Sequence, residues 1–238
     1  MRKSAIFLLF VAFCLTILGL SAQGGIAVSP QTARTKTEAE GKQKPEDSKQ
    51  RPVAKSKVYL LHSDLLRKDA SHPDAQIVTG NVRFRHDSVY MYCDSACYYD
   101  KVSSFEAFGN VKMVQGDTLF LYGDRLYYDG LTQIAEMRCN VRMENRTTTL
   151  LTDSLNYDRV YNLGYFFDGG TLMDEQNVLT SEWGEYSPQT KQSVFNYNVK
   201  LVNPQFTLTS DTLRYNTASK VADIVGPSDI WSDANHIY

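Results

Sequence analysis

The stretch GNVKMVQGDTLFLYGDRLYYD, residues 109–129, has two close relatives in the same chain. Residues 80–100 read GNVRFRHDSVYMYCDSACYYD, and residues 139–158 read CNVRMENRTTTLLTDSLNYD. Each version carries Asn-Val near its start, alternates apolar with charged residues, and ends on a Tyr-Asp pair. A segment that recurs at a fixed spacing predicts a stack of similar structural units.

The repeat is visible as columns that extend to residue 215. An acidic residue recurs every 29 or 30 positions, at Asp94, Asp124, Asp153, Glu182 and Asp211. A tyrosine follows each acid by four positions, at Tyr98, Tyr128, Tyr157, Tyr186 and Tyr215. The Asn-Val signature recurs at Asn81, Asn110, Asn140 and Asn198, whereas the fourth unit has Gly170-Thr171-Leu172-Met173 in its place. The columns predict repeats of about 29 residues.

Each repeat has the pattern of two strands. Apolar and charged residues alternate with a period of two, which is typical of a strand with one buried face. β-branched and aromatic residues are abundant, and the turn-prone pieces QGD (115–117), DGLTQ (129–133) and NPQ (203–205) separate the alternating segments. No helical stripe of 10 to 15 residues lies between them, so we expect an all-β fold.

The strand that contains the acid shifts its phase. Apolar or small residues stand three positions before each acid and two after it, so a regular strand would point them to opposite faces. A β-bulge or corner beside the acid, next to small residues such as Cys93 and Gly123, would return both halves to one core. We expect the acids to point outward and to accept local backbone N–H groups, as corner residues and not as catalytic ones. The repeated tyrosines are expected at the core edge, with their hydroxyls in water.

The first 57 residues differ from the repeats. Residues 1–22 have Arg2 and Lys3, an apolar run and small residues at the end, which predicts a signal peptide cleaved after Ala22. An uncleaved anchor is the alternative. Residues 23–57 are rich in Lys, Gln, Pro and Glu, which predicts a flexible polar linker. Without the ten basic and four acidic residues of this region, 15 basic and 23 acidic residues remain, which argues against nucleic acid as a partner.

No pattern in the sequence points to an enzyme. The cysteines after the signal peptide, Cys93, Cys97 and Cys139, lack metal-site spacing and predict no disulfide framework. His62, His72, His86 and His236 are scattered, and no Gly-rich phosphate loop or nucleophile elbow occurs. We therefore expect no catalytic residue, no metal site and no cofactor.

Over roughly residues 58–238, the G-N-V-[KR]-apolar strand, the short turn and the D-x-apolar-x-Y strand resemble the OstA-like family. This family includes the lipopolysaccharide transport protein LptA and the N-terminal domain of LptD. The resemblance implies an antiparallel V-shaped β-jellyroll, built from two-strand repeats, with an apolar groove between its layers. It also implies a component of a periplasmic bridge in a Gram-negative envelope, either free in the periplasm or associated with the outer membrane, that binds lipid A and passes lipopolysaccharide toward outer-membrane assembly. The implied protein partners join by edge-strand pairing and are either further copies of the chain or other Lpt-type jellyroll proteins.

Two sets of residues are candidates for lipid contacts under this resemblance. The cations that the repeat places at equivalent positions could contact lipid phosphates, or could form a solvated face paired with acids: Arg83, Lys112, Arg142 and Lys200. The inward apolar residues could line the groove, or could be plain core: Val82, Phe84, Val111, Met113, Leu121, Val141, Met143, Leu150, Val199, Leu201 and Leu208.

Two other functions and the end of the chain complete the sequence predictions. A structural or adhesive β-solenoid of the cell envelope is the alternative function. A polysaccharide-cleaving β-helix would need a cluster of acids and bases that interrupts the repeat, and the sequence shows none. The next corner acid is expected near residue 240, but the sequence stops at Tyr238 in mid-unit. We expect the sequence to be part of a longer protein; otherwise its last strand is an unpaired edge.

Overall fold

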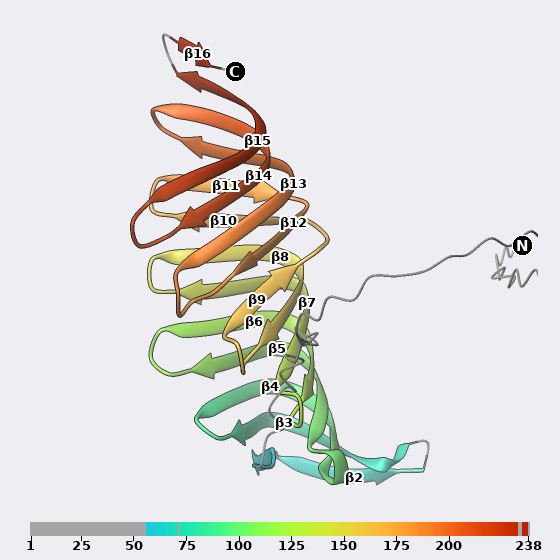
Figure 1. Cartoon of the computed structure of the whole chain (residues 1–238). Coiled ribbons are helices and arrows are strands. Elements are labelled where there is room, and N and C mark those ends of the chain that lie inside the picture. The colour runs from blue at the N-terminus through green and yellow to red at the C-terminus, as the bar shows by residue number, and fades with distance from the viewer. Residues whose placement is uncertain (1–55, 71, 233–234, 238) are drawn as a thin grey trace, which may run out of the picture. The chain divides into compact units, whose positions relative to one another are not determined.

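The computed structural model describes residues 56–70, 72–232 and 235–237 of the chain (Figure 1). The expected signal peptide (1–22) and almost all of the expected linker (23–57) lie outside these residues. Within them, sixteen strands form one antiparallel sheet, and the only other regular element is the 3₁₀ turn η1 (Asp100–Val102). No helix in this part is long and apolar enough to cross a membrane. The all-β, antiparallel prediction is confirmed.

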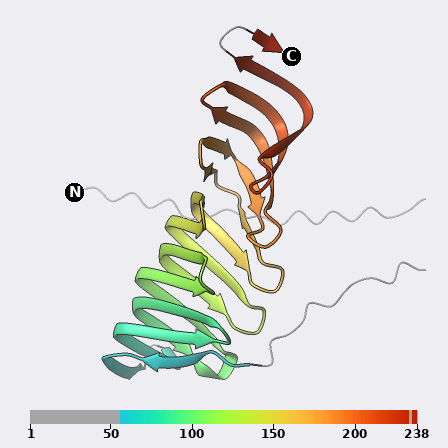
Figure 2. The ribbon, with the colours of Figure 1, turned by 90° about the vertical axis from the view of Figure 1, so that its left-hand side faces the viewer.

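The strand order in the sheet largely follows the chain, as expected for consecutive hairpins. Two short strands, β1 and β2, pair with the first long strand, β3. The long strands β3 to β8 then pair in succession (Figure 2). These strands are β1 (Tyr59–His62), β2 (Leu65–Asp69), β3 (His72–His86), β4 (Val89–Tyr99), β5 (Ser104–Gln115), β6 (Leu119–Asp129), β7 (Ile134–Asn145) and β8 (Thr148–Asp158).

The fourth repeat, in which the signature has decayed, is built from short strands instead of long ones. Here β10 pairs with β8 and β11, whereas β9 pairs with β8 and β12. Phe166 fills the space beside Gly170 and Gly184, where an added Cβ atom would lie 2.6 Å from its ring at either glycine. The remaining strands are β9 (Leu163–Phe166), β10 (Gly170–Asp174), β11 (Asn177–Ser181), β12 (Trp183–Tyr186), β13 (Gln192–Asn203), β14 (Phe206–Asn216), β15 (Val221–Ser232) and β16 (Asn235–Ile237).

The long strands bend at the Asn signature. Gly109 and Asn110 both have positive φ, of 73° and 44°, and equivalent pairs of left-handed residues occur at Gly80-Asn81, Cys139-Asn140 and Tyr197-Asn198. Between β5 and β6, Phe108 pairs with Arg125 and Val111 with Gly123. Three steps along β5 therefore match two along β6. The predicted corner beside the acid is confirmed, because the alternation of buried residues in β6 shifts its phase at Asp124 and Arg125. The extra residue of the bulge lies in the Asn strand.

Each bend divides a long strand into two halves, so the sheet folds into two layers that enclose the core. We call the layer with residues 82–93, 111–123 and 141–152 layer A, and the layer with residues 95–108, 125–138 and 154–166 layer B. The residues inside are almost wholly buried, and Phe84 stacks on Phe105 with ring centroids 4.2 Å apart. The five repeated tyrosines are buried as well, none more than 5% exposed. They are core residues.

Candidate functional site

The apolar candidates for lipid contact form a continuous core between the two layers. All eleven residues, from Val82 in β3 to Leu208 in β14, are between 0 and 3% exposed. They pack against one another in one hydrophobic cluster that extends through the repeats. Their role as lining of a lipid path stays a prediction, because a lipid chain could reach them only if the two layers separated.

The acids and asparagines of the repeat meet on the outside of the bend. An Asn side chain donates a hydrogen bond to the acid of the preceding strand, as Asn110 does to Asp94 (2.8 Å) and Asn81 to Asp64 (2.9 Å). Asn140 and Asn198 bind Asp124 and Glu182 in the same way. The expected backbone donor occurs at Asp153, which accepts the N–H of Asn140 at 3.3 Å. The same geometry explains Gly109, whose added Cβ atom would lie 2.6 Å from the Asp94 carboxylate.

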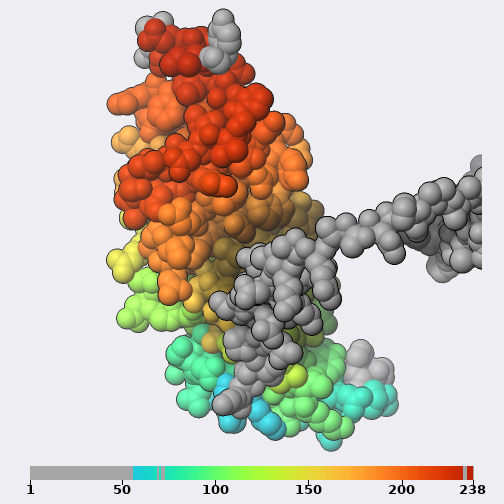
Figure 3. Space-filling view, viewed as in Figure 1, coloured from blue at the N-terminus to red at the C-terminus, as the bar shows by residue number. Residues whose placement is uncertain are grey.

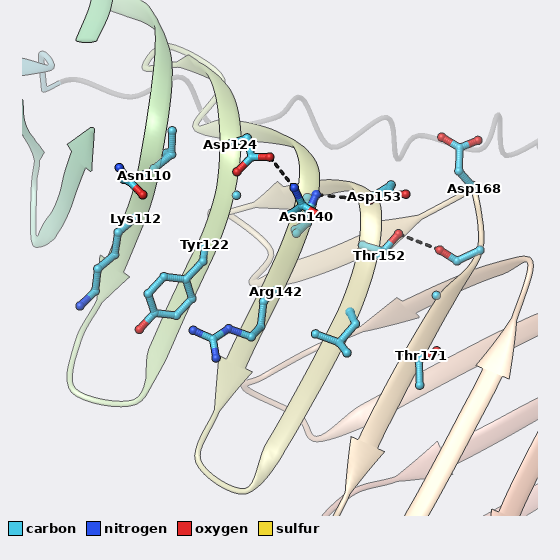
Figure 4. A pocket seen from close by; sticks show the side chains of 16 residues that line it. Asn110, Lys112, Tyr122, Asp124, Asn140, Arg142, Thr152, Asp153, Asp168 and Thr171 are labelled. Atoms are coloured by element: carbon cyan, nitrogen blue, oxygen red, sulfur yellow. Dashed lines mark hydrogen bonds between the residues drawn. The ribbon is translucent and has the colours of Figure 1, made fainter. Parts of the chain in front are cut away.

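A hollow of about 840 Å³ lies along these bends, where the fourth repeat departs from its neighbours (Figure 4). Two of the four candidate cations, Lys112 in β5 and Arg142 in β7, flank Tyr122 of β6 in this hollow, at 5.5 and 4.5 Å from the ring centroid. Arg142 also pairs with Glu144 at 3.0 Å. The lining contains three acids, Asp124, Asp153 and Asp168.

The other two candidate cations lie elsewhere. Lys200 lines a separate hollow of about 650 Å³ with Asp211 and Asp229, and Arg83 is exposed outside both hollows. The structure therefore brings together only half of the expected set, among acids, and a phosphate-binding role of the four stays a prediction.

Opposite the bends, the tips of the two layers meet in a column of polar side chains, which we call the mouth column. The last residue of β3, β5, β7 and β10 in layer A faces the tyrosine of the next repeat in layer B. The direct contacts are His86 Nδ1 with the Tyr128 hydroxyl (2.7 Å), Tyr186 donating to Asn145 (3.2 Å) and Tyr215 donating to Asp174 (2.8 Å). Gln115 reaches Tyr157 through Asn162, whose Oδ1 accepts from both (2.8 and 3.2 Å).

The tyrosine hydroxyls thus have protein partners, and the expectation that they lie in water was wrong. The Tyr98 hydroxyl also has a protein partner, because it donates to the Val58 carbonyl at 2.7 Å. Burial raises the pKa of Tyr128 to about 12, against the opposing effect of Arg159, so this hydroxyl stays protonated. Each hydrogen bond ties one layer to the other on the side where the chain itself makes no connection.

Cations reinforce the column at three levels. Arg159 donates to the Tyr128 hydroxyl and to His86 Nδ1, and Lys191 donates to Asn145. Lys220 lies 2.7 Å from both carboxylate oxygens of Asp174, whose side chain is fully buried. Buried polar groups of this kind are stable only when they are paired, and most of the column is paired across the two layers, with Gln115 Oε1 and Arg159 Nε as exceptions.

Sequence reasoning missed this column, although a signal for it exists. His86, Gln115 and Asn145 each stand five positions after the Asn of the signature, and Asp174 continues the spacing in the decayed repeat. Polar residues that recur at the tip of an otherwise inward-facing strand predict partners across a gap. The pattern gave no indication of which tyrosine would face which tip.

His86 gives the mouth column a dependence on pH. Because Arg159 can only donate to Nδ1, that nitrogen is an acceptor, and Nε2 faces Ser56. Burial and the Arg159 charge lower the pKa of His86 below its ordinary 6.5, although Asp87 and the Ser56 backbone act in the other direction. The neutral imidazole is therefore the form that the folded protein favours.

We expect the free energy of unfolding to fall as the pH drops below 6.5, because the unfolded chain then binds the proton that folded His86 resists. In His86→Gln, whose amide can replace the imidazole as Gln115 does in the next repeat, this part of the pH dependence should vanish. Urea unfolding of the full chain at pH 7.5 and 5.0 measures it, with the exposed His62→Gln as the control. Equal pH dependence in wild type and His86→Gln would contradict the assignment.

Comparisons with known proteins fit this architecture. The model of the family described as OstA-like protein matches residues 55–211, from just before β1 into β14. No curated protein matches the chain. Among solved structures, the chain is similar to LptH, described as the LptA homologous periplasmic component of the conserved lipopolysaccharide transport device from Pseudomonas aeruginosa. That similarity has 12% sequence identity and a TM-score of 0.42, and it covers 46% of this chain and 82% of LptH. Because the family model spans well over half of the sequence, the chain belongs to the OstA-like family.

Proposed function

We propose that the chain is a periplasmic carrier that binds the acyl chains of lipopolysaccharide between its two layers and forms one segment of a bridge to the outer membrane. The observation that carries the proposal is the apolar core, which runs without interruption through the stacked repeats of an OstA-like chain. Acyl chains gain about 0.8 kcal/mol for each CH₂ group buried. A long apolar path therefore suits a lipid that must cross water, and carriage along it requires no catalytic step.

The mouth column indicates where a lipid would enter. At the bend, the backbone of each long strand runs from one layer into the other. At the mouth, the two layers are held together by side-chain hydrogen bonds. Each such bond contributes about 1 kcal/mol net to stability, so contacts with a lipid can compensate for its loss. We infer that acyl chains enter between the tips, reach Met113 and Leu121, and displace neighbouring core contacts.

The C-terminal end of the stack supports the second part of the proposal, edge pairing. In β15, Ile224 and Ile230 continue the inward rows of Leu213 and Leu208, but Ile224 is 36% exposed because no further long strand covers it in the described residues. Figure 3 shows the residues of β15 and β16, in red, at the surface of this end. Such an edge can accept a further strand, whether from the same protein, from another copy or from another jellyroll protein of the transport system.

A photoreactive acyl probe tests the carrier. The full chain is irradiated with a lipid A analogue that carries a diazirine in one acyl chain, and the labelled residues are mapped by mass spectrometry. We expect labelling of inward residues such as Met113 and Leu121, competed by unlabelled lipopolysaccharide. The exposed outer residues Tyr92 and Tyr127 are the internal control. Labelling without competition, or confined to outer residues, would refute the carrier.

The same experiment addresses the alternative of a structural or adhesive β-solenoid. A solenoid that acts through its surface would tolerate a charge at Val141 once the variant is folded, whereas a carrier would lose acyl labelling. Val141→Lys, checked by circular dichroism, therefore separates the two.

A further inference from the structure

A second hollow, of about 490 Å³, opens at the mouth between the turns of the third and fourth repeats. Five turns contribute to it. They are the β5–β6 turn with Thr118, the β7–β8 turn with Arg146 and Thr147, the β10–β11 turn with Glu175, the β12–β13 turn with Gln189 and Lys191, and the β14–β15 turn with Lys220. In layer A, it lies at the opposite end of the strands from the bends, where the expected phosphate contacts are. The hollow therefore combines residues that no sequence motif had joined.

Two of the three cations of this hollow, Arg146 and Lys191, are not matched by acids in the described part of the chain. Lys191 donates to the amide oxygen of Asn145, and among the described residues neither Lys191 nor Arg146 has a carboxylate within ion-pair distance. Lys220, by contrast, is paired with Asp174 and with Glu175. Burial and the nearby Arg146 charge lower the pKa of Lys191, so the two cations repel each other. Elsewhere on the sheet the arginines of layer B pair with glutamates, as Arg125 does with Glu106 and Arg138 with Glu136.

Glu175 also lines the hollow and pairs with Lys220, and the rest of the lining is neutral and includes hydrogen-bond donors. The hydroxyls of Thr118 and Thr147 and the side-chain amide of Gln189 border the hollow. An anion with several oxygens could accept from these groups while its charge removes the repulsion between Arg146 and Lys191. A phosphate group, with three terminal oxygens and up to two charges, fits both requirements.

We propose that this hollow, formed by Arg146, Lys191 and the adjacent threonines, binds the phosphate monoester of an amphipathic ligand. Its position beside the Tyr186–Asn145 bridge places the phosphate in water while an attached acyl chain passes between the layers. The lipid source of the phosphate rests on the proposed function, whereas binding of the phosphate itself does not.

The test compares three probes on the full chain by isothermal titration calorimetry: inorganic phosphate, dihexanoyl phosphatidic acid, and dihexanoylglycerol, which lacks the phosphate. The variant is Arg146→Gln/Lys191→Gln, and the matched control is Lys101→Gln/Arg125→Gln, which removes one lysine and one arginine that lie outside the hollow and pair with Asp74 and Glu106. Arg146→Gln/Lys191→Gln should weaken the binding of phosphatidic acid about tenfold or more, as expected for two lost charge-assisted bonds. The control variant should weaken this binding less than about twofold. Arg146→Lys/Lys191→Arg should retain binding, which separates charge from folding.

The outcomes distinguish this site from the proposed carrier. The same loss for inorganic phosphate would support the hollow as a phosphate site with free phosphate as its source. Equal affinity of wild type and Arg146→Gln/Lys191→Gln for phosphatidic acid, or no binding of either phosphate probe, would overturn the site. If the acyl probe still labels Met113 in that variant, the carrier survives the failure of the site. If phosphate binds but no acyl labelling occurs, the carrier fails and the site stands.

Discussion

Replacing Phe84 by alanine should lower the free energy of unfolding by about 4 kcal/mol. The Phe84 side chain is fully buried in layer A and contacts layer B through Phe105 and Tyr98, with ring centroids 4.2 and 5.3 Å away. Removal of the ring loses the free energy gained by burying it. It also leaves a cavity that the two hydrogen-bonded layers cannot close. Urea unfolding of the full chain, followed by tryptophan fluorescence, measures the loss.

Two comparisons sharpen this prediction. Phe167→Ala removes the same ring from an exposed position and should cost less than about 0.5 kcal/mol. Phe84→Leu should fall between the two phenylalanine-to-alanine variants. A loss below about 1 kcal/mol for Phe84→Ala would show that the ring is not a core contact between the layers.

The same variant separates a core role from a groove role. If acyl chains pass along the Phe84 row, a bound chain can fill the cavity, and saturating lipid should restore part of the lost stability by binding only the folded state. Lipid that stabilises wild type and Phe84→Ala equally would place the acyl chains away from this row.

Asp174→Ala should cost about 3 kcal/mol, because it removes the fully buried carboxylate of the mouth column. Lys220 would lose both contacts at 2.7 Å, and the Tyr215 hydroxyl would lose its acceptor at 2.8 Å. The estimate lies at the lower end for buried pairs because the Lys220 side chain is 32% exposed, and water can solvate part of its charge. Urea unfolding again gives the value.

Glu175→Ala is the matched control for this prediction. Glu175 is the next residue and also pairs with Lys220, at 3.2 Å, but its side chain is 59% exposed, so its removal should cost less than about 0.5 kcal/mol. The double variant Asp174→Ala/Lys220→Met should be more stable than Asp174→Ala alone, because no amine is left beside an empty position. Similar losses for Asp174→Ala and Glu175→Ala would refute the importance of the buried pair.

The sequence was sufficient to predict the bend, but not its detailed construction. The five-residue separation across Asp124 required a change of phase, and a bend occurs there. The left-handed residues are in the neighbouring strand, where Gly109 and Asn110 adopt positive φ at low cost. The acids then bind the Asn side chains that this conformation brings within reach. A hydrophobic pattern indicates which face of the sheet a side chain occupies, but it carries no information on the backbone angle φ.

By itself, the sequence determined the all-β fold, the 29-residue repeat, the inward rows and the outward corner acids, because these depend on neighbours within one or two strands. Only the tertiary structure decided which tips meet at the mouth. Tyr128 could have faced Gln115 of its own repeat, but it faces His86, 42 residues away, since stacked strands slant across the two layers. Both tips recur with the same period, so the repeat is compatible with either pairing. The offset follows from the twist and packing of the whole sheet, and it alone brings Arg146, Lys191 and Lys220 into one hollow.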